Sequence, residues 1–309
     1  MSTYLSLNTY QLCLPSIDLN ESSEQAFADA FLRSAQILHQ HLEKIESAIG
    51  SSKDFTREPF NTAILGLFTK MSNHYYSYVF LEINHDWTGS KFLLENLCEA
   101  AITLIYLLEE VDRELFPEYI SASLHQARYL LIDVEEQLQK FPNHPELLLL
   151  RDKLDTFITK EQEHAASPLT THSKAYSWGP QEADTTAKRG AVMGLNFLTN
   201  PARQLALRVM PASWLDLQLS YLNSFDESSR TQAQTSINFT NLRDAAHLCL
   251  HATKTFIEEV VNHQGVKAAD IEHQQQLLNV LYEWFHNAHN VYQLHSCAAQ
   301  CELGAHSGD

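Results

Sequence analysis

The stretch Leu93–Leu108, LLENLCEAAITLIYLL, decides the fold class of this 309-residue chain. It contains no Gly or Pro, and its aliphatic side chains fall on nearly every side of a helical wheel. A helix that is apolar all round is normally buried inside a protein. Glu95 and Glu99 interrupt the run, so it does not have the pattern of a membrane span. We therefore predict a central buried helix over about 89–111, an all-α fold and no membrane insertion.

The remainder of the chain predicts more helices on both sides of this one. Only nine Gly and nine Pro occur, and both residue types interrupt regular structure. The long segments are rich in Leu, Ala, Gln and Glu, which favour helices. The other expected helices cover about 22–49, 58–85, 113–141, 144–165, 187–197, 201–209, 214–222, 228–263 and 268–301. We expect a multi-helix bundle of roughly nine or ten helices.

One segment has the composition of a loop between two parts of the chain. Residues 166–184 are rich in Ser, Thr, Pro and Gly and poor in apolar residues. The predicted organisation is an irregular N-terminal arm over 1–20, an N-terminal helical bundle over 21–165, this loop or linker over 166–184, a C-terminal helical part over 185–301 and a flexible tail over 302–309. The two helical halves are expected to pack together.

Charge and cysteine content limit the classes of partner and compartment. The formal net charge is −17, which disfavours binding to nucleic acid or to an anionic membrane surface. Five cysteines form an odd set without the spacing of a disulfide framework, which is typical of a reducing compartment. The first ten residues lack the basic start and apolar run of a signal peptide. We expect a cytoplasmic protein.

Four residues on two neighbouring expected helices suggest a metal site. Glu82 and His85 form Glu-x-x-His, which places a carboxylate and an imidazole on one helix face. Glu95 and Glu99 form a polar stripe on the central helix. Ferritin-like dimetal proteins combine Glu-x-x-His pairs with single Glu residues from other helices, and they hold iron or manganese. Because Glu82 and His85 lie at a helix end, and not in the middle of a bundle, this site is an alternative and not our preferred interpretation.

Three further pairs have the spacing of metal ligands on one helix face: Glu161 with His164, His247 with His251, and Cys297 with Cys301. The first pair lies at the end of its expected helix, beside the loop. We expect the His247 pair to lie on a solvated face that it shares with Lys254 and Glu258. We expect the two cysteines to be free thiols.

The central segment resembles the core helix of an uncharacterised bacterial all-helical family, catalogued only as a domain of unknown function. Glu99, Tyr106 and Leu107 match its buried Glu, following aliphatics and Tyr-Leu pair, and the likeness covers about fifty residues around Leu93–Arg128. Where that family has Arg four residues before the Glu, this chain has Glu95. The family's Ser-and-His signature toward the C-terminus is not recognisable here. The resemblance implies a helical fold and no particular activity.

A second resemblance involves the first expected helix. The segment from Arg33 to His39, RSAQILH, is similar to the Arg-and-His motif of the HEPN ribonucleases. In that family the Arg stabilises a phosphate and the His acts as acid or base in metal-independent RNA cleavage. The resemblance implies the same two roles for Arg33 and His39. Here the motif lies in the first helix, whereas in the family it comes late in the bundle.

These patterns leave three interpretations of function. We favour a helical interaction or scaffold protein that acts through a protein partner or through self-association, because no catalytic constellation stands out. A dimetal enzyme based on Glu82, His85, Glu95 and Glu99 is one alternative. A HEPN-like ribonuclease or defence effector based on Arg33 and His39 is the other.

Overall fold

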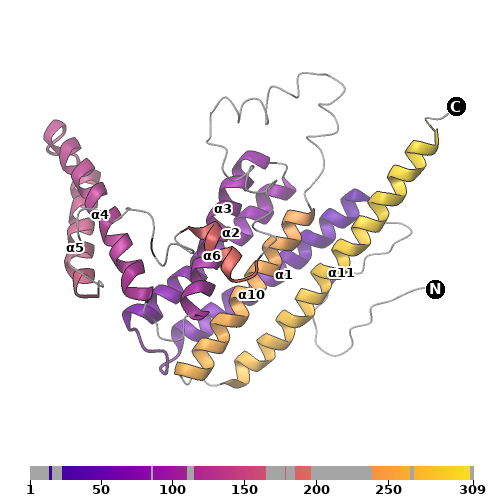
Figure 1. Cartoon of the computed structure of the whole chain (residues 1–309), viewed down its shortest axis with the longest axis horizontal. Coiled ribbons are helices and arrows are strands. Elements are labelled where there is room, and N and C mark those ends of the chain that lie inside the picture. The colour runs from indigo at the N-terminus through magenta and orange to yellow at the C-terminus, as the bar shows by residue number, and fades with distance from the viewer. Residues whose placement is uncertain are drawn as a thin grey trace. The chain divides into compact units, whose positions relative to one another are not determined.

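The computed structural model describes residues 14–15, 23–84, 86–109, 115–164, 178, 185–195, 239–264 and 268–306 (Figure 1). These residues form α-helices and one short 3₁₀ helix, and no strand occurs among them. The elements are α1 (Glu24–Ser51), α2 (Pro59–Ile83), α3 (Trp87–Glu109), α4 (Leu115–Lys140), α5 (Pro145–Glu161), the 3₁₀ helix (Gln162–His164), α6 (Thr186–Val192), α10 (Phe239–Gln264) and α11 (Ala268–His306). The all-α prediction is confirmed.

The number of helices is smaller than predicted for the part of the chain that is described. Eight α-helices occur there, against the nine or ten expected. The helices expected over 201–209 and 214–222 lie outside the described residues. The helix expected over 187–197 ends earlier, because Gly194 has a φ of 72° and closes α6 with a left-handed turn. Leu195 N–H donates to the Gly190 carbonyl and Gly194 N–H to the Ala191 carbonyl, which is the Schellman pattern.

The chain divides into two compact units, and the division differs from the one predicted. The first unit comprises Met1–Ile105 and Phe197–Asp309, and the second comprises Tyr106–Asn196. The composition of 166–184 had suggested a boundary there. Instead α10 and α11 join the N-terminal helices, because their apolar faces pack against α1 and α2. The predicted bundle over 21–165 is thus divided between the two units.

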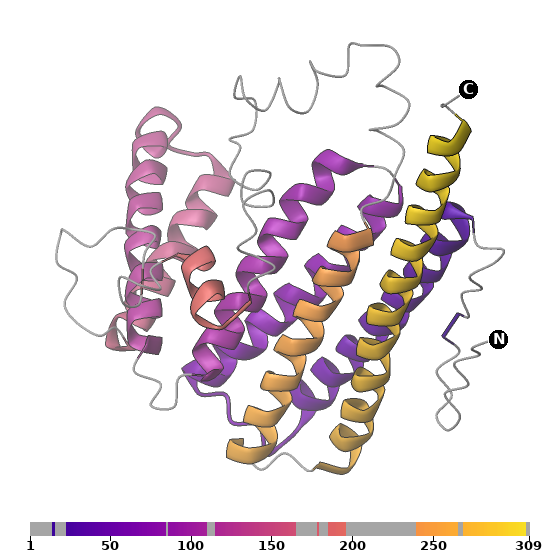
Figure 2. The same cartoon turned by 45° about the vertical axis from the view of Figure 1, so that its right-hand side comes forward.

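The first unit has a core of packed helices, in which α10 (orange in Figure 2) lies beside α11 (yellow). Most described side chains of α10 are buried. Helix α10 packs against α2, α11 and α1, and α1 also packs against α2 and α11. Aromatic side chains fill one part of this core. Phe31 lies at their centre, 5.1 Å from Phe239, 5.5 Å from Trp284 and 5.9 Å from Phe285, measured between ring centroids. Such edge and tilted contacts add to the free energy gained from burying the rings.

Helix α3, expected to be the most buried element, is buried only in its second half. Side chains from Leu97 to Leu107 are mostly buried, whereas Phe92 near the start is 46% exposed. The Asp86 carboxylate accepts the Gly89 N–H at 2.9 Å and caps the first turn. Among the described residues, no helix is sufficiently long and apolar to cross a membrane.

The second unit contains the antiparallel pair α4 and α5, followed by α6 (Figure 1). Trp178 supports its core: its ring lies 5.2 Å from Tyr119 and 5.8 Å from Tyr106. The buried guanidinium of Arg189, on α6, lies 4.1 Å from the centre of the Trp178 ring. This cation–π contact provides the buried cation with an electrostatic partner. It connects α6 to the start of α4.

Candidate functional site

A group of polar side chains in the first unit lies where α10 packs on α11. One face of α10 carries four of these residues at helical spacings: Thr240, Arg243, Asp244 and His247. The facing side of α11 carries three at matching spacings: Tyr282, His286 and His289. We call these seven residues the α10–α11 polar cluster.

Arg243 organises one end of this cluster. Its Nε and Nη2 atoms donate to Asp244 Oδ1 at 2.8 and 2.6 Å, and its Nη1 donates to His289 Nδ1 at 2.8 Å. Because a guanidinium has no acceptor atom, His289 Nδ1 must be unprotonated. The ring proton is therefore on Nε2, which donates to Thr240 Oγ1 at 3.0 Å. Both ring nitrogens of His289 are thus occupied.

His289 is fully buried and stays uncharged at neutral pH. Its pKa is lowered to about 4, chiefly by burial and then by the Arg243 charge, while the Asp244 carboxylate acts in the opposite direction. The nearby His286 also disfavours the charged ring. The geometry and the pKa agree, since a protonated ring could not accept from Arg243.

His247 is a second neutral imidazole. Its ring stacks on Tyr282 at 4.3 Å, and a hydrogen bond to the Tyr282 backbone holds it in place. Its pKa is lowered to about 4, chiefly by burial and then by the Arg243 charge, against a smaller opposing effect of Asp244. Its Nε2 atom is buried without a hydrogen-bond partner. The predicted solvated face is wrong at His247, because α11 covers it.

The contacts of the α10–α11 polar cluster fix how the two helices pack. They give less indication of a chemical reaction. Every N–H of Arg243 that approaches a partner is directed at Asp244 or His289, so the guanidinium is not free for an anionic ligand. Over the described part of the chain, no three His, Cys, Asp or Glu side chains are grouped so that they could hold a metal ion. A buried polar network with directional bonds favours one register of the two helices over others.

The residues predicted for a dimetal site are not gathered by the described structure. Glu82 is 4% exposed, and its Oε1 accepts a hydrogen bond from Ser90 Oγ at 2.7 Å. Glu95 and Glu99 lie on the exposed side of α3, and His85 lies outside the described residues. Partial burial raises the pKa of Glu95, and the neighbouring Glu99 charge raises it further. The Ser90 hydroxyl therefore hydrogen-bonds to Glu82, and the carboxylates of Glu95 and Glu99 face solvent.

Arg33 and His39, the residues predicted for RNA cleavage, lie on different sides of α1. Six residues of an α-helix separate them by about 120° around the axis and about 9 Å along it. Arg33 is exposed, whereas His39 is half-buried and stacks on Tyr76 at 4.5 Å. His39 also lies 3.4 Å from Glu43, measured from Nε2 to Oε1. The roles predicted for Arg33 and His39 stay a prediction.

The second unit has a feature that the sequence analysis missed, on α5. No residue of this helix is buried, although its sequence includes four consecutive leucines. One side of α5 packs against α4. On the opposite side Leu149 is 56% exposed and Phe157 is 37% exposed. The signal was present in the sequence, since a helix of this length with apolar residues on two sides needs two covering surfaces.

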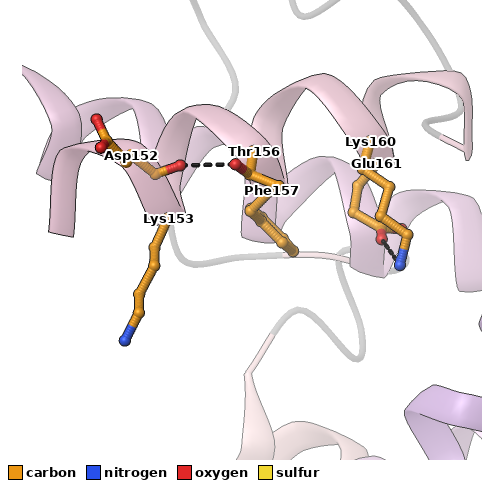
Figure 3. Close-up of a pocket in the computed structure, with 6 residues that line it drawn as sticks. All are labelled: Asp152, Lys153, Thr156, Phe157, Lys160 and Glu161. Carbon is orange, nitrogen blue, oxygen red and sulfur yellow. Dashed lines mark hydrogen bonds and ion pairs between the residues drawn. The ribbon is translucent and has the colours of Figure 1, made fainter. Parts of the chain in front are cut away.

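A shallow hollow of about 370 Å³ runs along the same side of α5 (Figure 3). Its lining residues are Asp152, Lys153, Thr156, Phe157, Lys160 and Glu161. They form two rows of residues four apart, and such rows are the ridges that bound a groove on a helix surface. Thr156 Oγ1 donates to the Asp152 carbonyl at 2.7 Å, and Lys160 Nζ lies 3.5 Å from Glu161 Oε1. A groove of this kind accepts a row of side chains from another helix.

Comparison of the chain with protein-family models, with curated proteins and with solved structures finds no match.

Proposed function

We propose that this protein is a helical interaction or scaffold protein that binds through the side of α5 facing away from α4. We call this surface the outer face of α5 and define it by Glu146, Leu149, Lys153, Phe157 and Lys160. The observation that supports the proposal best is the exposure of Leu149 and Phe157 on a helix without a single buried residue. Exposed apolar side chains grouped on one surface are typical of binding sites.

The free energy available from burying the outer face of α5 indicates what kind of partner can bind there. Completing the burial of Leu149 and Phe157 would contribute about 2 kcal/mol in total, because both side chains are already partly covered. This is too little for a stable complex, which must also offset the loss of translational and rotational freedom. The partner must therefore also fill the groove beside Phe157. An amphipathic helix does so, since its own ridge fits between the two rows of α5.

The two enzymatic alternatives have weaker support. A dimetal site needs Glu95 and Glu99 to face other ligands, and both are exposed. A HEPN-like ribonuclease needs Arg33 and His39 at one phosphate, whereas the His39 ring is half-buried and stacked on Tyr76.

Site-specific photo-crosslinking in the cells that produce the protein tests the proposal. A photoreactive phenylalanine analogue at position 149 should give a protein adduct whose crosslinked segment is helical and apolar. The matched control places the same analogue at Leu294 of α11, which is 66% exposed and distant in sequence from α5. If position 149 gives no adduct, or no more than position 294, the outer face of α5 is not a binding surface and the proposal fails.

A further inference from the structure

We infer that the outer face of α5 binds the same face of a second copy of this chain, antiparallel and about a two-fold axis at Lys153. This inference rests on the proposed function and names its partner. A two-fold interface must be self-complementary, so each residue has to suit the residue that the symmetry places opposite it. The sequence of the outer face meets this condition.

The outer-face residues form one stripe that is balanced about Lys153. The spacings from Glu146 through Leu149, Lys153 and Phe157 to Lys160 are three, four, four and three, which keeps all five on one side of a helix. Leu149 and Phe157 lie four residues before and after Lys153. Glu146 and Lys160 lie seven residues before and after it.

An antiparallel pair places residues equally far from the axis opposite one another. Leu149 then meets Phe157 of the second copy, and the contact occurs twice. Glu146 meets Lys160 of the second copy, also twice, so both charged contacts are attractive. A parallel pair would instead place Glu146 against Glu146 and Lys160 against Lys160. The charges therefore select the antiparallel arrangement.

The charged residues are available for such contacts. Glu146 is exposed, and the Lys160 side chain is 77% exposed. Lys160 lies 3.5 Å from its neighbour Glu161, but an exposed pair of this kind contributes little and does not prevent the side chain from turning.

Lys153 lies at the axis, where it would approach its own symmetry copy. Its flexible stem can cover the adjacent apolar side chains while the ammonium group points to solvent. The neighbouring Asp152 carboxylate is paired with Arg151 at 2.7 Å, so the repulsion between the two ammonium groups is not cancelled at the axis. Two like charges at the centre make the association reversible and weaker than that of a fully apolar stripe. Lys153→Met should therefore tighten it, by about tenfold.

A charge exchange across the axis tests the pairing directly. Sedimentation equilibrium of the full-length chain should show a dimer that Glu146→Lys weakens, because both end contacts become Lys against Lys. Lys160→Glu should weaken it as well, because both contacts become Glu against Glu. Each loss should be about tenfold in the dissociation constant. Mixing the two variants should restore dimers that contain one copy of each, and the double variant should again pair with itself.

Mixing the two charge variants distinguishes a loss of pairing from a loss of helix stability. Glu146→Lys also removes an acidic residue from the first turn of α5, which weakens the helix by itself. A variant that had merely lost its helix would not be restored by mixing with Lys160→Glu. Native mass spectrometry of a mixture with one copy made heavier by isotope labelling identifies the mixed dimers.

Three results would overturn the inference. These are a strictly monomeric wild-type chain at high micromolar concentration, a dimer unaffected by either single variant, and a mixture that contains no mixed dimers. Photo-crosslinking from position 149 distinguishes this failure from that of the proposed function. An adduct with a different protein would leave α5 as a binding surface and exclude the second copy as its partner. If no adduct forms, both the proposed function and this inference fail.

Discussion

The buried histidines of the α10–α11 polar cluster predict that the first unit loses stability in mild acid. His289 has a pKa of about 4 in the folded protein, and an unfolded His has a pKa of about 6.5. Between these values the unfolded chain binds more protons than the folded chain, so the free energy of unfolding falls as the pH falls. The stabilisation is complete above pH 6.5 and is lost progressively toward pH 4.

The size of the loss follows from the two pKa values. Between pH 7.5 and pH 5, His289 should account for about 2 kcal/mol, and over the whole window for about 3 kcal/mol. His247, whose pKa is also about 4, should contribute a similar amount. The two contributions are not independent, because both rings are close to Arg243.

Native-state hydrogen exchange of the α10 amides, measured from pH 5 to pH 7.5, gives the opening free energy of this unit. The variant His289→Asn retains an acceptor for Arg243 and cannot be protonated. It should show a pH dependence smaller than that of the wild type by about 2 kcal/mol at pH 5.

Two results would refute this reasoning. One is an NMR titration in which the His289 ring protonates near pH 6.5 in the folded protein. The other is an equal pH dependence in the wild type and in His289→Asn.

Three further changes test the described packing. Phe31→Ala, at the centre of the aromatic core, should lower the free energy of unfolding measured in urea by about 3–5 kcal/mol. The control Leu294→Ala, on the exposed surface, should change it by less than about 0.5 kcal/mol, and similar values for both would show that Phe31 is not a core residue. Ser90→Ala removes the hydroxyl that donates to the buried Glu82, and should destabilise by about 1–3 kcal/mol in the same assay; an unchanged midpoint would show that this hydrogen bond is not formed. Gly194→Ala forces a side chain into a left-handed backbone, and should lower the thermal midpoint of the second unit by an amount equivalent to about 1 kcal/mol; an unchanged midpoint would exclude the turn that ends α6.

Local sequence patterns predicted the positions of helices reliably, because a helix forms from residues that are close together in the chain. Most described helices begin and end within a few residues of their predicted bounds, and Pro59 and Pro145 stand at the first turns of α2 and α5, where a missing N–H costs nothing. The same patterns were poor at deciding which face of a helix is covered. The resemblance to the uncharacterised helical family implied a buried Glu at position 99, and Glu99 is exposed, whereas His247 was expected on a solvated face and is covered by Tyr282.

In the candidate sites, too, the sequence predicted which helix a residue belongs to better than which residues it contacts. Glu82 and Ser90 were each placed on the correct helix, but their hydrogen bond depends on the geometry between α2 and α3, which spacing along one helix does not reveal. The contacts of Arg243 and Thr240 with His289 join residues more than forty positions apart. No local pattern indicated them. The outer face of α5 could have been found, because the apolar residues on its second side are visible in the sequence.

The amino-acid sequence by itself determined the all-α class and the positions of most described helices, because helix formation depends on propensity, caps and breakers that lie close together in the chain. It also determined the balanced stripe on α5, which is a property of spacing alone. Only the tertiary structure decided that α10 and α11 pack with the N-terminal helices, which histidines are uncharged, and which carboxylates face solvent. These features depend on burial by segments distant in sequence, and burial sets both the free energy of packing and the pKa of each enclosed group.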